Sequence, residues 1–298
     1  MANITSTELT LNIATIMGAE ALGYLKSNTV LARLVNRDFE NEIAAYGQTI
    51  DIPFSGTLSV NSKVANTVVT LQNPTTTKVS LTLNHHEEVS FLIEDFGRAL
   101  ARADWLTTYA GDAMAHLAEE IDADIAALYS GFSQTVDAAA GLTEAHFRSA
   151  RRLLNSAKAP LGQRYAVLHE DAEYEALGIE RITNRDYAES LGQGAADSMI
   201  GRFAGFDLLM DQQIKVAAGL AKNMFFQRNA ICFATRPLPP APEGAGVVQT
   251  VMSEDGIGLR VTLSYNPDYL GVQVTIDVLY GVAELRDNHG VVVSTTEI

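Results

Sequence analysis

Apolar and polar residues alternate along the stretch from Ser55 to His86, which contains no aspartate or glutamate. Alternation with a period of two is typical of strands that have one apolar face. The segment QNPT, Gln72–Thr75, is a turn signal between the runs. The pattern therefore predicts a long β-hairpin arm, whose apolar positions are Leu58, Val60, Val69, Leu71, Val79, Leu81 and Leu83.

Strand and helix signals precede this arm. The residues TIDIPF, Thr49–Phe54, predict a strand that leads into it. Further upstream, Ser6 or Thr7 caps a predicted helix that Asn28 closes, and a short apolar patch follows at Val30–Val35. Because two strands cannot cover their own apolar face, a lone hairpin is marginally stable in water. The arm therefore needs a surface to lie on, and another molecule can supply that surface.

The strongest helix signal in the chain follows the arm. Asp104 is placed to cap this helix and Gly131 to end it. At about 26 residues the helix would span roughly 40 Å, which is about twice the average helix length. We predict that it is the structural spine of the molecule. Its apolar positions recur in steps of three and four: Ala110, Met114, Leu117, Ile121, Ile125 and Leu128.

The region from about 136 to 243 is predicted to be a mixed α/β unit. Thr143 caps a helix over EAHFRSARRLLNSA, and the following RYAVLH is a strand. A glycine-rich loop at Gly192 and Gly194 precedes further segments, including a strand over NMFFQRNAICFATR. Segment 237–247 holds four prolines and two glycines, so it is a connector that cannot be helical. Alternating strands follow it.

Composition and charge narrow the class of protein. The chain has 298 residues, 47% of them hydrophobic, which suffices for one large domain or two interleaved ones. A net charge of -15 argues against a protein that grips nucleic-acid phosphates. The single cysteine, Cys232, excludes an internal disulfide framework and a multi-cysteine zinc site. No signal peptide and no apolar run near ~18 residues is visible, so we expect a soluble protein from a reducing cytoplasm, without membrane contact.

No catalytic, cofactor-binding or metal-binding set emerges from the sequence. On the spine helix, Asp112, His116 and Glu119 or Glu120 share one face, but no second helix offers a matching Glu-x-x-His. A solvated or partner-facing acidic stripe explains them better. In the run His85–Glu88, neighbouring strand residues point to opposite faces, which disfavours a metal site there too. The glycine-rich loop lacks the dinucleotide-binding fingerprint.

Three later segments carry a family resemblance. Met199–Ile214 contains an I-G-x-x-x-G-F pattern, Leu220–Pro240 contains F-x-R-N-A followed by A-T-R, and Leu279–Val293 contains Y-G with paired strands. Taken with the order of arm, spine helix, α/β middle and proline connector, the chain resembles the major capsid (coat) proteins of tailed double-stranded DNA bacteriophages. Those of short-tailed phages look most similar, and the resemblance covers nearly the whole chain.

The resemblance implies an α+β fold, the tailed-phage major capsid fold, built in four parts. It implies an N-terminal arm (1–46), an extended loop (47–93), a peripheral domain with the spine helix (94–135 and 244–282) and an axial domain (136–243 and 283–298). Some short-tailed phage coats insert an extra domain in the axial region. That region is too short here to hold one, so other contacts must supply the stabilisation.

The resemblance also implies a structural protein and not an enzyme. Copies would form the pentamers and hexamers of an icosahedral head that encloses DNA without sequence-specific binding, assembled in the host cytoplasm and found in the virion. No acidic prodomain precedes Thr7, so a separate scaffolding protein is an implied partner, as is a portal protein; no cofactor is implied. An encapsulin-like bacterial nanocompartment shell is the alternative, followed by a metal-dependent enzyme that uses Asp112, His116 and Glu119.

Charge predicts one contact between subunits. The only charged residues between Ser55 and Asn84 are two lysines, whereas the spine helix is acidic. We expect the arm to lie over the acidic peripheral surface of a neighbouring copy. Strand pairing and apolar burial should dominate, because exposed ion pairs contribute only ~0–1 kcal/mol each. The residues assigned to this contact are Lys63, Lys78, Glu119, Glu120, Asp122 and Asp124.

Overall fold

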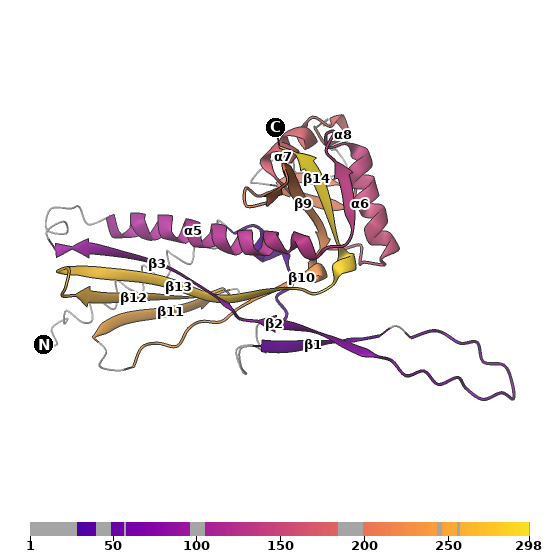
Figure 1. Cartoon of the computed structure of the whole chain (residues 1–298), viewed down its shortest axis with the longest axis horizontal. Helices are drawn as coiled ribbons and strands as arrows, with labels where there is room; N and C mark the ends of the chain where they lie inside the picture. Colours follow the sequence, from indigo (N-terminus) through magenta and orange to yellow (C-terminus); the bar gives the residue numbers. More distant parts are fainter. Residues whose placement is uncertain are drawn as a thin grey trace, which may run out of the picture.

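The computed structural model describes residues 29–39, 49–56, 58–95, 105–183, 199–242, 246–254 and 257–297. Figure 1 shows a long helix lying along a sheet, a second sheet with helices at one end, and an arm that projects beyond both. This mixture confirms the expected α+β class. The predicted N-terminal helix, its end at Asn28, the cap at Asp104 and the loop at Gly192 and Gly194 lie outside the described residues.

The first sheet has five strands, and all of its pairings are antiparallel. β13 is central, because it pairs with β3 along one edge and with β12 and then β10 along the other. Alternate residues of β12 and β13, such as Val261 and Ile276, are buried, as period-two patterning requires. The strands are β3 (His85–Glu94), β10 (Ile231–Thr235), β11 (Val247–Glu254), β12 (Ile257–Asn266) and β13 (Gly271–Glu284).

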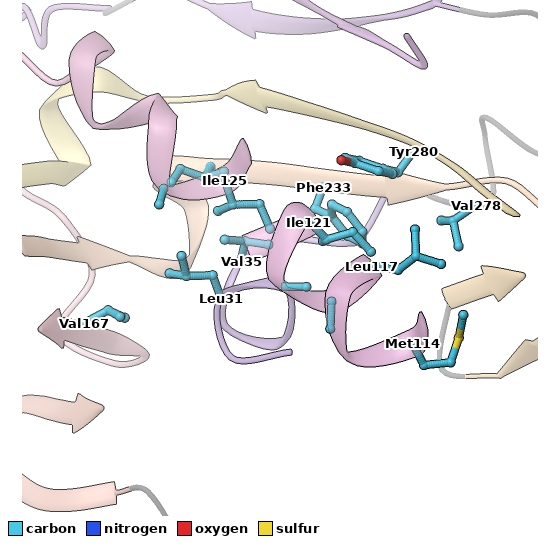
Figure 2. Close-up of a cluster of buried hydrophobic side chains, with 14 of the residues drawn as sticks. Leu31, Val35, Met114, Leu117, Ile121, Ile125, Val167, Phe233, Val278 and Tyr280 are labelled. Atoms are coloured by element: carbon cyan, nitrogen blue, oxygen red, sulfur yellow. The ribbon is translucent and has the colours of Figure 1, made fainter. Parts of the chain in front are cut away.

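The predicted spine helix is α5 (Trp105–Ala127), and it lies along this sheet (Figure 1). A 3₁₀ turn, η1 (Leu128–Gly131), ends it where Gly131 was expected to. The short helix α2 (Leu31–Leu34) packs against the same core. Figure 2 shows that the predicted apolar stripe faces β10 and β13, and the residues involved are Met114, Leu117, Ile121, Ile125, Phe233, Val278 and Tyr280.

The second sheet has seven strands and mixes parallel with antiparallel pairs. Helix α6 (Glu144–Ser156) packs against its buried face, and Phe147 meets Phe225 edge to face, with ring centroids 5.3 Å apart. Thr143 caps α6 in a capping box with His146, which confirms the predicted start. The remaining elements are β4 (Thr135–Ala138), β5 (Arg164–Leu168), α7 (Glu170–Leu177), α8 (Glu180–Thr183), β6 (Met199–Phe203), β7 (Phe206–Met210), β8 (Val216–Ala217), β9 (Leu220–Gln227) and β14 (Gly290–Thr296).

The segment NMFFQRNAICFATR is not one strand, as the sequence suggested, but two. A 3₁₀ turn, η2 (Arg228–Ala230), separates β9 in the seven-stranded sheet from β10 in the five-stranded one. The Gln227 side chain accepts a hydrogen bond from the Asn229 N–H at 2.9 Å, which supports the turn. β10, within the predicted axial range, and β3, largely within the predicted extended loop, both belong to the five-stranded sheet.

Three short 3₁₀ turns carry the chain between the two sheets. η1 joins α5 to β4, η2 joins β9 to β10, and η3 (Asp287–His289) joins β13 to β14. The Ala230 carbonyl accepts the Leu285 N–H at 2.7 Å. Asp287 accepts the N–H of Ser133 at 2.6 Å and its hydroxyl at 2.7 Å. These bonds tie the turns together into a single waist between the sheets, formed by η1, η2 and η3.

The arm is a hairpin only at its root. β1 (Thr49–Ser55) pairs with β2 (Thr76–Thr82), which confirms the predicted strand TIDIPF. Beyond them, the described residues 58–75 form two extended legs without strand pairing. The predicted turn at Gln72–Thr75 is wrong, because the chain reverses near Asn66, which has a φ of 64°. Asparagine tolerates this left-handed conformation, so the reversal falls there.

Candidate assembly surface

The arm tip, defined as residues 58–72, exposes a run of apolar side chains. Val60 is 100% exposed, Val68 91% and Leu71 89%. Single exposed apolar residues are common, but a contiguous exposed group indicates an interaction site. The other members of this group are Leu58, Val64 and Val69.

Hydrogen bonds hold the two legs of the arm together. The Ser59 N–H donates to Gln72 Oε1 at 2.7 Å, and Gln72 Nε2 donates back to the Ser59 carbonyl at 2.5 Å. Nearer the root, the Gly56 N–H donates to the Thr75 carbonyl at 2.8 Å. A segment that is shaped before it binds loses less conformational entropy on docking. The arm tip is therefore suited to present its apolar side chains to a partner.

The root of the arm is fixed to the body of the molecule. Ile52 and Leu81, from β1 and β2, pack with Cys232 and Ala234 of β10 in a separate apolar cluster. β2 also crosses β13 closely, since a Cβ atom at Gly281 would lie 2.2 Å from the Thr82 carbonyl oxygen. Only glycine allows that approach. These contacts therefore fix the root of the arm relative to the five-stranded sheet.

A three-residue contact ties the strand after the arm to the spine helix. The Tyr280 hydroxyl donates to Asp124 Oδ2 at 2.6 Å, and His85 Nδ1 lies 2.9 Å from the same oxygen. The His85 ring stacks on the Tyr280 ring, with centroids 5.1 Å apart. Burial and the bond to Asp124 both raise the pKa of Tyr280, so its hydroxyl stays a proton donor. This contact joins β3, β13 and α5.

Replacing Tyr280 by phenylalanine is expected to lower the free energy of unfolding by about 1–3 kcal/mol, because a half-buried Asp124 loses a donor. Urea denaturation of the unassembled protein measures this. Tyr269→Phe is the matched control, since Tyr269 is 65% exposed and should tolerate the loss of its hydroxyl. Equal midpoints for the Tyr280→Phe variant and the parent would show that the hydrogen bond contributes nothing.

Four of the six residues assigned to the subunit contact are exposed. Lys63 lies on the arm tip, where its ammonium donates to the Val64 carbonyl at 2.8 Å. Lys78 lies near the root and pairs with Asp51 of its own chain at 2.5 Å. Glu119 and Glu120 are exposed on α5. These four remain available for a contact between copies, although Lys78 already has an internal partner.

The other two residues face the interior of their own chain. Asp122 is only 2% exposed, and it accepts the N–H groups of Val30 at 2.6 Å and Ala32 at 3.1 Å. Asp122 therefore anchors the start of α2 to the spine. Burial and the nearby Asp211 carboxylate raise its pKa to about 7. With Asp124 bound to Tyr280, the predicted acidic surface on α5 reduces to Glu119 and Glu120.

The candidate metal ligands of the sequence are not brought into a metal-binding set. His116 Nδ1 lies 3.1 Å from Glu119 Oε2, and both side chains are more than half exposed. His86 pairs with Asp277 at 3.1 Å, away from His85, as strand alternation requires. Within the ranges that the structure describes, no three His, Cys, Asp or Glu side chains are placed to hold a metal ion. Cys232 is buried, and burial raises the pKa of its thiol to about 12.

Sequence reasoning missed the internal partners of these charged groups. Tyr280 lies 156 residues from Asp124, and only the packing of α5 on the five-stranded sheet brings them together. Asp51 meets Lys78 because β1 and β2 pair in a register that places Asp51 opposite Ser80. One signal was present for Asp122: it is four residues from Ala118 and four from Ala126, both on the buried face of α5.

Comparisons with known proteins find similarity to phage capsid proteins and to a virus-like particle. A family model described as phage capsid protein matches residues 110–237. A solved structure from Mycobacterium phage Che8 is 19% identical, with a TM-score of 0.67 over 89% of this chain and 90% of that one. The capsid of cyanophage P-SCSP1u is 14% identical, with a TM-score of 0.64 over 91% and 89%. A virus-like particle from Pyrococcus furiosus is 10% identical, with a TM-score of 0.53 over 92% and 96%.

Two further findings complete the comparison. No curated protein matches the chain. Among the helices described here, none is both long enough and apolar enough to cross a membrane. The resemblance to the major capsid proteins of tailed phages is thus confirmed, by sequence in the capsid-family match to residues 110–237 and by fold over most of the chain.

Proposed function

We propose that copies of this chain assemble into the pentamers and hexamers of a closed icosahedral shell around double-stranded DNA. The capsid-family match and the shared fold support a shell protein. The observation that carries the proposal is the arm tip, which projects from the body (Figure 1). Its apolar side chains are left exposed by the described part of its own chain. Such a segment is suited to lie on a second copy.

Rigid and projecting parts have separate tasks in such a shell. The spine helix and the waist keep distances within one subunit fixed, while the arm reaches a neighbour at angles that differ slightly between pentamers and hexamers. Each contact can be weak, because every subunit makes several of them. A net charge of -15 also keeps free subunits apart until specific contacts form, and it disfavours tight binding of DNA to the inner wall.

We propose the four parts expected from the family resemblance, and the two observed sheets indicate where two of them lie. The five-stranded sheet with α5 supports a peripheral domain, and the seven-stranded sheet with α6 and α7 supports an axial domain around the capsomer centres. A separate scaffolding protein and a portal protein are proposed as partners during assembly in the host cytoplasm. The finished shell is proposed to belong to the virion.

Electron microscopy of the protein expressed alone and with a scaffolding protein tests the proposal, which expects closed shells of uniform size. A Lys63→Glu variant probes the charge contact between the arm tip and Glu119 or Glu120 of a neighbour. Because an exposed pair contributes up to ~1 kcal/mol, the critical subunit concentration should rise measurably, by up to about fivefold. Light scattering against subunit concentration measures this change.

Arg152→Glu is the matched control for this variant, because it reverses an exposed charge on α6 rather than on the arm. It should assemble at the parent concentration. Identical critical concentrations for the Lys63→Glu variant and the parent would remove the charge contact from the proposal and leave the apolar contact. Failure of the parent protein to form any shell, with or without a scaffold, would overturn the proposal itself.

A bacterial nanocompartment is the second candidate. The similarity to a virus-like particle from Pyrococcus furiosus, over 92% of this chain, favours a shell of this architecture without specifying its contents. Shells isolated from the native source separate the two candidates. Nuclease-protected double-stranded DNA inside them supports a phage head, whereas an enclosed protein cargo supports a compartment.

A further inference from the structure

A cavity of about 320 Å³ lies between the spine helix and the loop that follows β7. Its walls are rich in side-chain oxygen atoms. Asp122 and Glu119 come from α5, whereas Asp211, Gln212 and Gln213 come from the loop after β7. The cavity therefore lies where the spine helix meets the seven-stranded sheet, apart from the arm.

Asp211 is the distinctive residue of this cavity. It is only 6% exposed, and its Oδ1 atom accepts the Gln213 N–H at 2.8 Å. Its Oδ2 atom is closed off from solvent and has no hydrogen-bond partner. Burying a carboxylate oxygen without a hydrogen-bond partner lowers the stability of the folded protein, and a bound cation would offset that cost.

Asp122 adds a second buried carboxylate of the same sign. Asp122, from α5, and Asp211, from the loop after β7, line the same cavity. Asp122 accepts backbone N–H groups of Val30, Leu31 and Ala32. A carboxylate has about four lone-pair sites, so these bonds leave room for a further partner. Two buried carboxylates that repel each other are stabilised when a cation lies between them.

The chemistry of the donors indicates which cation fits. Carboxylates and amide carbonyls are hard oxygen ligands, which suit calcium better than zinc or copper. Glu119 also lines the cavity, but among the described residues no three His, Cys, Asp or Glu side chains are placed to hold a metal ion together, so amide oxygens and water must complete the coordination. Calcium tolerates such an irregular, partly hydrated shell, whereas magnesium demands a near-ideal octahedron.

We propose that this cavity binds a calcium-class divalent cation, with Asp122 and Asp211 as its carboxylate ligands and Gln212 or Gln213 supplying amide oxygens. The cation links the spine helix, the start of α2 and the loop after β7. It therefore stabilises the packing of the spine against the seven-stranded sheet, whether or not the chain is assembled.

The test uses the full-length unassembled protein, freed of metal with a chelator, at pH 7.5. Calcium chloride is expected to raise its melting temperature saturably, beyond the effect of sodium chloride at equal ionic strength. Asp211→Asn keeps the side-chain oxygen that accepts the Gln213 N–H but removes the charge, and it should weaken the response at least tenfold. Glu120→Gln removes an exposed charge of α5 that does not line the cavity, and it should respond as the parent does.

Three outcomes would overturn the proposal. They are a parent protein without a saturable response, an Asp211→Asn variant with an unchanged response, and a stronger response to magnesium than to calcium. Circular dichroism shows whether the variant is folded. If it is not, calorimetric titration of the parent with calcium decides, because the absence of saturable heat rejects the site directly.

Discussion

A variant in which Val60, Val68 and Leu71 are all replaced by serine is expected to fold normally and to form no closed shells. These side chains are between 89% and 100% exposed, so the isolated subunit gains little from them. Exposed substitutions usually change the free energy of unfolding by no more than about 0.5 kcal/mol. In a shell, each would be buried against a neighbour, at roughly 25 cal/mol for each Å² of apolar surface removed from water. Electron microscopy and sedimentation measure the loss of shells.

Leu161→Ser and Val216→Ser together are the matched control. Both side chains are exposed, at 67% and 40%, but neither lies on the arm. This variant should form shells in the parent yield. Shells of normal size and yield from the triple arm variant would show that the arm tip does not dock on a neighbour, and they would remove the observation on which the proposed function depends.

The second large effect is expected at the spine helix. Ile121→Ala should lower the free energy of unfolding by about 2–5 kcal/mol, because it leaves a cavity where α5 packs on the five-stranded sheet. Ile121 is 1% exposed and belongs to the largest apolar cluster of the described chain (Figure 2). The midpoint of urea denaturation, followed by circular dichroism on the unassembled protein, measures the change.

The neighbouring residue provides the control for this substitution. Glu120→Ala removes an exposed side chain one position earlier on the same helix and should change stability by less than about 0.5 kcal/mol. An Ile121→Ala variant as stable as this control would mean that α5 is not packed on the sheet as described. The spine would then be a surface helix rather than the centre of the fold.

The spine helix could be predicted because its signal is local. Apolar residues in steps of three and four identify one buried face without knowledge of what covers it. The same holds for α6, where Thr143 and the residues after it make a capping box. β1, β12 and β13 were likewise recognised from period-two alternation, because each has one face in a core. β14 differs, because Val292 lies in one apolar cluster and Val291 in another.

Other features depended on distant parts of the chain and could not be predicted. The run through β9 and β10 reads as one strand because both halves are apolar, and only the two sheets show that η2 must divide it. In the arm, Val60 and Leu71 alternate like strand residues but stay exposed. Hydrophobic periodicity predicts that a surface is buried, but it does not identify the molecule that buries it.

For the same reason, the sequence could not separate the exposed candidate contact residues from the internal ones. Net charge along the sequence identifies an acidic helix, but it does not separate exposed acids such as Glu119 from internal ones. Asp124 accepts a hydrogen bond from Tyr280, a contact that forms because α5 packs on the five-stranded sheet. The burial of Asp122 could have been predicted, because helical periodicity places it among buried alanines.

The waist makes the connection between the two sheets resistant to twisting. Three backbone crossings run side by side there, cross-linked through Ala230, Asp287 and Ser133. Twisting one sheet against the other would strain all three at once, whereas a single flexible linker would yield easily. In the proposed shell the two sheets would therefore turn as one stiff unit, and differences in angle would be taken up at the contacts between neighbouring subunits.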